Sequence, residues 1–203
     1  MAHVALIGAS GRAGSAILKE LSDRGHKVTA IARNPEKIAT LPNVTAKKGD
    51  VFDKNGLATL LKGHDAVVSA VHFSASDAST LIEAVRAAGA KRYLVVGGAG
   101  SLEVAPGKRL VDQPDFPAAY KAEALKGGEF LDLLKGEKQL DWTFLSPSAL
   151  FVAGERTGKF RLGKDTLLTH DKGSSISFED YAIALVDEIE KPAHSRARFT
   201  VGY

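Results

Sequence analysis

The chain has 203 residues, of which 44% are hydrophobic and 25% are charged, and these proportions are typical of a globular domain. The length supports one well-packed domain with a small appendage, and it excludes two domains that each have a full core. The formal net charge is +3 and no long block of like charge occurs, so we expect an anionic small ligand and no nucleic acid.

Up to residue 146, short apolar runs rich in β-branched residues alternate with longer segments of helical periodicity. Strands are predicted over residues 4–7, 28–31, 44–48, 66–69, 93–96 and 142–145. Helices are predicted over residues 13–21, 81–88 and 117–134, where large apolar residues recur on one face. Continuous apolar strands separated by helices are typical of a parallel sheet that is covered on both faces. We therefore expect an α/β fold, a Rossmann-type doubly wound parallel sheet made of about six βα repeats.

The pattern changes after residue 146. Residues 154–173 are punctuated by glycine and predict short strands and loops. Residues 177–180 (Ser-Phe-Glu-Asp) match a helix N-terminal capping pattern ahead of a helix over 181–189, and residues 198–201 predict a last strand. We expect residues 1–203 to form a single domain, in which residues 146–176 are a small insertion on the substrate side.

A glycine-rich turn follows the first predicted strand and opens the first predicted helix. Residues 8–14 are Gly-Ala-Ser-Gly-Arg-Ala-Gly, in the context in which such a turn binds a dinucleotide. The first glycine allows a tight turn, the second allows backbone N–H groups to approach a pyrophosphate, and the third allows close packing of helix on strand. The alternative is a turn that only joins strand to helix. On the binding interpretation, the contact residues are Gly8, Ser10, Gly11, Arg12, Ala13 and Gly14.

The end of the second predicted strand indicates which dinucleotide is bound. An NAD-preferring protein has Asp or Glu there for the ribose 2′-hydroxyl, whereas this chain has Arg33. The guanidinium is permanently charged and offers a forked set of donors that suits a 2′-phosphate, and Arg12 in the glycine turn could reach the same group. The pair predicts NADP(H) in preference to NAD(H). The alternative is that Arg33 is only a solvated loop residue.

Several kinds of site are not expected. The chain has no cysteine, which excludes disulfides and thiolate chemistry, and its six histidines never occur as His-x-x-x-His, so we expect no metal site. The first apolar run, residues 4–7, is far too short to cross a bilayer and has no basic leader. We expect a cytoplasmic protein without membrane partners.

Five motifs, in order along the chain, carry a family resemblance. They are residues 7–14 (Ile-Gly-Ala-Ser-Gly-Arg-Ala-Gly), 31–37 (Ile-Ala-Arg-Asn-Pro-Glu-Lys), 48–53 (Lys-Gly-Asp-Val-Phe-Asp), 96–102 (Val-Gly-Gly-Ala-Gly-Ser-Leu) and 145–151 (Leu-Ser-Pro-Ser-Ala-Leu-Phe). Together they resemble the NAD(P)H-binding proteins of the atypical short-chain dehydrogenase superfamily, and most closely its NmrA-like and NADH-flavin reductase members. The resemblance covers essentially the whole chain.

The resemblance implies further cofactor contacts at the ends of other strands. These contacts are Asp50 and Val51 beside the adenine, Ala70 and Val71 along the groove after the fourth strand, Gly97, Gly98 and Ala99 near the nicotinamide ribose, and Ser146 and Pro147 at the border of the nicotinamide.

One departure from the superfamily concerns catalysis. Short-chain dehydrogenases that act on alcohols and ketones use a Tyr-x-x-x-Lys pair, in which the lysine lowers the pKa of the tyrosine. No tyrosine of this chain has a lysine four residues later. Tyr120 and Lys121 lie where such a pair usually lies and are candidate catalytic residues, with a helix-start aromatic and a surface lysine as the alternative. Ser101 is a third candidate, as a hydrogen-bond donor, and His72 is a candidate proton source whose alternative is an ordinary loop histidine.

Three functions are compatible with these features. The first is an NADPH-dependent oxidoreductase that passes a hydride to a planar acceptor such as a flavin or a quinone, because such an acceptor does not need the missing pair. The second is a non-catalytic NADP(H)-binding sensor of the NmrA type. The third is an epimerase or dehydratase, which is disfavoured because those reactions need a proton-transferring pair. We expect a monomer or a homodimer.

Overall fold

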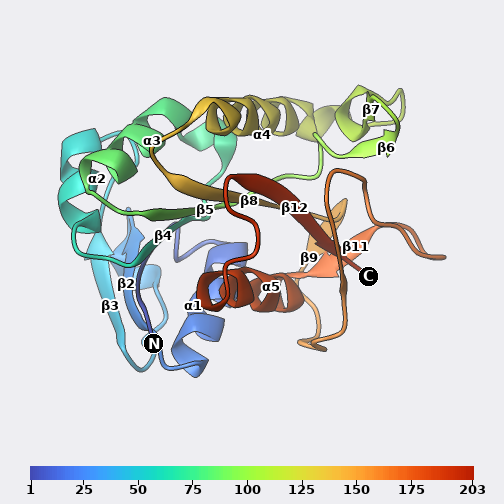
Figure 1. Cartoon of the computed structure of the whole chain (residues 1–203). Coiled ribbons are helices and arrows are strands. Elements are labelled where there is room, and N and C mark those ends of the chain that lie inside the picture. Colours follow the sequence, from blue (N-terminus) through green and yellow to red (C-terminus); the bar gives the residue numbers. More distant parts are fainter.

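The computed structural model describes residues 1–203 and contains one eight-stranded sheet with helices on both faces (Figure 1). The strands of this sheet are β1 (His3–Ile7), β2 (Lys27–Ala32), β3 (Val44–Lys48), β4 (Ala66–Ser69), β5 (Arg92–Val96), β8 (Asp141–Pro147), β10 (Arg161–Gly163) and β12 (Ala197–Gly202). Their order across the sheet is β10-β12-β8-β5-β4-β1-β2-β3. Every neighbouring pair is parallel except β10 and β12.

Five α-helices cover the sheet. Figure 1 shows α1 (Arg12–Asp23) and α5 (Phe178–Glu190) on one face, and α2 (Lys54–Leu61), α3 (Ala78–Ala87) and α4 (Ala118–Gly136) on the other. Buried apolar side chains form one core of 23 residues under α1 and α5 and another of 21 residues under the other three helices. Because the two cores are nearly equal in size, the central strands are buried on both faces, which explains their continuous apolar sequences.

Shorter elements lie in the connections between these strands and helices. Three 3-10 turns, η1 (Pro35–Lys37), η2 (Phe73–Ala75) and η3 (Leu110–Asp112), lie in the connections. Strands β6 (Glu103–Ala105) and β7 (Lys108–Arg109) form an antiparallel pair, and β9 (Leu150–Val152) pairs in parallel with β11 (Ser175–Ser177). None of the helices has the length and hydropathy needed to cross a membrane.

The strand order determines where a ligand can bind. Strand β1 lies between β2 and β4, so the chain moves in one direction across the sheet from β1 to β3 and in the other from β4 onwards. In doubly wound sheets, ligands bind in the crevice at the carboxyl ends of the strands on either side of this reversal. The glycine-rich turn begins at that point, because it follows β1 directly.

The doubly wound fold and each predicted strand are confirmed, but the structure differs from the expected helices in two places. The pattern of about six βα repeats is wrong at the connection from β2 to β3, which contains only η1, because Pro35 allows a short turn and too few residues follow for a crossover helix. Helix α2 was not predicted, although Asp53 caps it by accepting a hydrogen bond from Gly56 N–H at 3.0 Å. Within residues 146–176, the first two residues complete β8 and β10 forms the sheet edge, while the substrate-side role of this segment stays a prediction.

The predicted cap of the last helix is confirmed. Ser177 Oγ accepts a hydrogen bond from Asp180 N–H at 2.9 Å and donates one to the carbonyl of Glu155 at 2.9 Å. One buried side chain therefore both starts α5 and holds the preceding segment against it.

Replacing Ser177 with Ala should lower the free energy of unfolding by about 1–2 kcal/mol, because both bonds are lost at a buried position. Urea unfolding measures this change. The matched control is Ser79→Ala, at an exposed position of α3 whose side chain makes no hydrogen bond, and it should change the free energy of unfolding by less than about 0.5 kcal/mol. Equal losses in the two variants would contradict the assignment of Ser177 as the cap.

Candidate functional site

The glycine-rich turn is shaped by two close approaches within the protein. Gly8 has a φ of +83°, a left-handed conformation that favours glycine, and a Cβ there would collide with the carbonyl of Ala70. A Cβ at residue 14 would collide with the carbonyl oxygen of Gly8, so the start of α1 can pack against the end of β1 only because Gly14 has no side chain. At Gly11 the nearest atom to a Cβ would be 3.3 Å away. Gly11 is exposed, so its outer side is free for a ligand.

The amino end of α1 offers unsatisfied donors at the same place. No side chain caps this helix, and its first hydrogen bond runs from Ser15 N–H to the carbonyl of Gly11 at 2.8 Å. The N–H groups of Arg12, Ala13 and Gly14 therefore have no acceptor within the helix. Together with the helix dipole they favour an anion beside the exposed residue Ser10. The turn thus fits the pyrophosphate of a dinucleotide.

Two arginines beside this turn have no partner. Arg12 and Arg33 are exposed, and neither guanidinium makes an ion pair or a hydrogen bond. Every other arginine of the chain does, namely Arg24, Arg86, Arg92, Arg109, Arg156, Arg161, Arg196 and Arg198. The two free guanidinium groups therefore belong to the first residue of α1 and to the residue after β2, which is where the sequence predicts contacts with a 2′-phosphate.

The predicted adenine contacts lie beyond β3. Asp50 is exposed and its Oδ1 accepts a hydrogen bond from Phe52 N–H at 2.9 Å, while Val51 is half-buried against the core. After β4, Ala70 and Val71 are half-buried and lie against the turn, since both would obstruct a side chain at residue 8. The structure thus brings the segment after β4 into contact with the glycine-rich turn.

The predicted nicotinamide contacts lie at the ends of β5 and β8. Gly97 donates its N–H to the carbonyl of Leu145 at 2.9 Å, which joins the loop after β5 to β8. Gly98 and Ala99 are half-buried in that loop. Ser146 and Pro147 are buried inside β8, so they can border a ligand only at the end of that strand.

The candidate catalytic residues do not all lie together. Tyr120 and Lys121 are exposed in the first turn of α4, and neither side chain makes a hydrogen bond. Ser101 lies beside Gly128, since a Cβ at residue 128 would be 3.9 Å from Ser101 Cβ. Gly128 follows Tyr120 by eight residues of helix, about 12 Å along the axis. Ser101 is therefore well separated from the Tyr120 end of α4.

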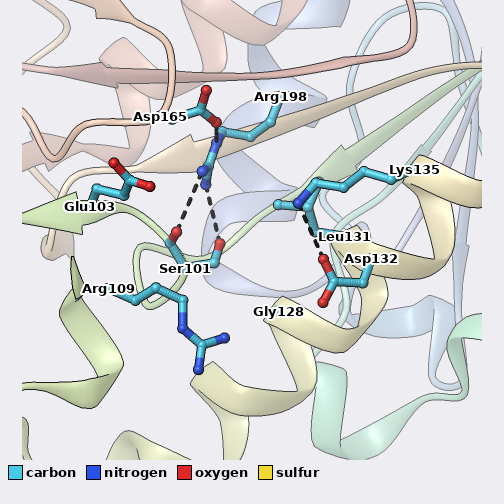
Figure 2. Close-up of a pocket in the computed structure, with 9 residues that line it drawn as sticks. All are labelled: Ser101, Glu103, Arg109, Gly128, Leu131, Asp132, Lys135, Asp165 and Arg198. Atoms are coloured by element: carbon cyan, nitrogen blue, oxygen red, sulfur yellow. Dashed lines mark hydrogen bonds and ion pairs between the residues drawn. The ribbon is translucent and has the colours of Figure 1, made fainter. Parts of the chain in front are cut away.

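Ser101 instead lines a polar cavity of about 420 Å³ between α4 and the start of β12 (Figure 2). The cavity is lined by Ser101, Glu103, Arg109, Gly128, Leu131, Asp132, Lys135, Asp165 and Arg198. Its cations are paired within the protein, Arg109 with Asp112, Lys135 with Asp132, and Arg198 with Asp165.

Sequence reasoning did not find Glu123, which holds α4 beside the segment after β4. The Glu123 carboxylate accepts hydrogen bonds from the N–H groups of Phe73 at 2.7 Å and Ser74 at 2.8 Å. Its Oε1 also lies 3.4 Å from Nδ1 of His72, whose side chain is 85% exposed. This contact places the first turns of α4, and with them Tyr120, near the carboxyl end of β4. A signal was present in residues 127–128 (Gly-Gly), because glycine inside a helix indicates a close approach, here of the Phe73 ring.

The ionisation of Glu123 is set by the same contacts. Burial disfavours the carboxylate, but hydrogen bonds from Ser74 and Phe73 and the nearby His72 outweigh it, so the pKa of Glu123 lies below its ordinary value of 4.5.

The strand order, the glycine-rich turn and the uncapped helix together define a Rossmann-type dinucleotide-binding protein. The chain belongs to the NAD(P)H-binding family, whose model matches residues 8–192, and the resemblance predicted from the motifs is thereby confirmed. It is 46% identical over 209 residues to the uncharacterized protein YwnB of Bacillus subtilis, across 98% of this chain and 97% of that protein.

Two solved structures are also similar to this chain. A Bacteroides thetaiotaomicron protein named "putative epimerase" is 45% identical, with a TM-score of 0.95 over 99% of this chain and 96% of its own. A Streptococcus pneumoniae protein named "putative NADH-flavin reductase" is 40% identical, with a TM-score of 0.83 over 100% of this chain and 99% of its own.

The two glycines of the turn should respond differently to substitution. Gly14→Val should prevent folding or lower the free energy of unfolding by roughly 3 kcal/mol or more. The reason is that the added atoms would collide with the backbone of Gly8, which cannot move aside as a flexible side chain could. Gly11→Val should leave the protein folded and weaken NADPH and NADH binding alike, because it blocks only the approach of the pyrophosphate. Thermal unfolding and calorimetric titration measure the two effects. A Gly11→Val protein that loses only one dinucleotide would contradict this geometry.

The contacts of Glu123 should make stability depend on pH. Because the folded-state pKa is depressed, the stabilisation is fully present above pH 4.5 and is lost as the pH falls through the lower, folded-state value. Glu123→Gln should therefore be less stable than wild type by about 1 kcal/mol at neutral pH, with a difference that shrinks below pH 4.5. Unfolding measured across this range tests the effect. Glu129→Gln, an exposed position of α4 without a bonded partner, should show no such trend.

Proposed function

We propose that this chain is an oxidoreductase that binds NADPH in preference to NADH and passes its hydride to a planar acceptor such as a flavin or a quinone. The observation that carries the proposal is the pair of unpartnered guanidinium groups, Arg12 and Arg33, beside a glycine-rich turn that fits a pyrophosphate. Two exposed cations with no partner of their own suit the additional phosphate of NADPH, and no carboxylate stands at the end of β2.

The remaining cofactor contacts follow the carboxyl edge of the sheet. Residues 8–14 would hold the pyrophosphate, and the segments after β3 and β4 would hold the adenine and the adjoining ribose. The loop 97–99 and the end of β8 at Ser146 and Pro147 would border the nicotinamide. These segments follow strands in the order β3, β1, β4, β5 and β8, so one extended ligand can meet them along the edge.

The bound nicotinamide would supply the hydride, and the protein would supply position. A Tyr-x-x-x-Lys pair is missing, because the residue four after Tyr120 is Ala124, which Gly100 approaches closely. We therefore assign Tyr120 a role as an exposed ring against which a planar acceptor packs, and Lys121 a role as a neighbouring cation for an anionic acceptor. The Tyr120 side of the site is open, with 66% of Tyr120 exposed, so the proton can come from water.

The similar Streptococcus pneumoniae protein, named "putative NADH-flavin reductase", supports a flavin as the acceptor. The epimerase alternative, which the name of the Bacteroides relative suggests, is disfavoured because the chain has no Tyr-x-x-x-Lys pair for the proton transfer.

A second candidate is an NADP(H) sensor without turnover. The separation of Ser101 from Tyr120 and Lys121 favours it, because the candidate catalytic residues do not form one set. The sensor uses the same dinucleotide site and differs only in the absence of acceptor-dependent oxidation.

Replacing Arg33 with Asp should weaken NADPH binding by on the order of 2 kcal/mol, because attraction to the 2′-phosphate becomes repulsion. NADH binding should change little, since NADH lacks that phosphate. Isothermal titration with both dinucleotides measures the change. Lys62→Asp makes the same change of charge at an exposed residue after α2 and is the control. Unchanged NADPH affinity in the Arg33→Asp protein would remove Arg33 from the site.

A further inference from the structure

Arg198 is a buried cation that joins three segments. It lies on β12, and only 7% of its side chain is exposed. Its Nη1 donates to Ser101 Oγ at 3.1 Å and to Ser146 Oγ at 3.3 Å, and its Nη2 donates to the Ser101 carbonyl at 3.4 Å. Its Nε donates to Asp165 Oδ1 at 2.8 Å. Figure 2 shows this guanidinium pointing from the strand toward the Ser101 loop.

The serines that Arg198 contacts lie on the two segments that flank the proposed nicotinamide end. Ser101 closes the loop that begins at Gly97, and Ser146 lies near the end of β8. The loop is bonded to β8 at its start, through Gly97 N–H and the Leu145 carbonyl. Arg198 supplies a second connection at the other end of the loop. The position of the intervening residues relative to β8 is therefore fixed from both sides.

We propose that Arg198 is a positioning residue for the nicotinamide half of the dinucleotide, an inference that rests on the cofactor site proposed above. Arginine suits this role because its planar fork donates to several acceptors at fixed angles, whereas the single ammonium of lysine cannot span them. Because the Arg198 side chain is buried, the loss of any of these hydrogen bonds would leave part of a buried charge without a partner, which is costly. Its contacts are with Ser101, Ser146 and Asp165, so it acts through these residues and not on the cofactor directly.

The location of Arg198 makes the proposal selective. In the sheet, β8 and β2 are separated by β5, β4 and β1, a distance of about 19 Å at the usual strand spacing. The proposed 2′-phosphate and adenine contacts at Arg33 and Asp50 lie at the far end of this span. A change at Arg198 should therefore affect the nicotinamide end and leave the adenine end as it is.

Two probes separate the ends of the site. NADP⁺ contains both halves, whereas adenosine 2′,5′-bisphosphate contains the adenine, the ribose and the 2′-phosphate without the nicotinamide. Isothermal titration of each probe into the full-length wild type, Arg198→Met and Arg198→Lys measures both ends independently of turnover. Arg196→Met is the matched control, because Arg196 is two residues away and donates to the Lys138 carbonyl instead.

Both Arg198 variants should raise the Kd for NADP⁺ about tenfold and change that for adenosine 2′,5′-bisphosphate less than about twofold. The Arg196 variant should leave both values unchanged. Equal losses for the two probes, or no loss for either, would overturn the role of Arg198 while leaving the cofactor site intact. If Arg198→Met does not fold, Arg198→Lys and Ser101→Ala test the proposal instead. Each should raise the Kd for NADP⁺ and leave that for adenosine 2′,5′-bisphosphate nearly unchanged. A wild type that binds neither probe would overturn the proposed cofactor site, and this inference with it.

Discussion

The contact between Gly14 and the carbonyl oxygen of Gly8 is the constraint on which the rest of the site depends. A side chain at residue 14 would push the start of α1 away from the end of β1. Because Gly14 packs directly against Gly8, the uncapped N–H groups of α1 lie at the carboxyl edge of the sheet, at the point where the strand order reverses. The same contact places Arg12, the first residue of the helix, beside the turn. Backbone packing alone thus presents these N–H groups at the edge of the sheet, without the help of a side chain.

Electrostatics then distinguish this site from the rest of the surface. Elsewhere the protein pairs its guanidinium groups, and Arg24 alone bonds to Glu20, Asp187 and Glu190. Arg12 and Arg33 remain unpaired and exposed, which costs little stability because an exposed charge keeps its contact with water. Their charge is consequently available to a phosphate. At the other end of the sheet edge the arrangement is reversed, since Arg198 is buried and its donors are used to hold protein segments together.

The parts of the fold that sequence could predict are those encoded locally. Runs such as residues 93–96 indicate buried strands because a parallel sheet covered on both faces leaves no polar alternation, and Ser177 indicates a helix start through its own hydroxyl. The helix α2 was missed because it has only eight residues and begins with Lys-Asn-Gly, although Leu57, Leu60 and Leu61 recur at helical spacing. The roles of Glu123 and Arg198 could not be predicted, since their partners lie 50 and 97 residues away along the chain. The separation of Ser101 from Tyr120 could not be predicted either, because it depends on the path of the loop along α4.

Hydride transfer to a planar acceptor separates the proposed oxidoreductase from a sensor. The most direct test is to follow NADPH oxidation with FMN, FAD or a small quinone, with calorimetric titration of NADPH, NADP⁺, NADH and NAD⁺ on the same preparation. We expect oxidation that requires the acceptor, increases in proportion to protein concentration and is faster with NADPH than with NADH. Tight binding of NADP(H) without acceptor-dependent oxidation would contradict this expectation and identify the protein as a sensor.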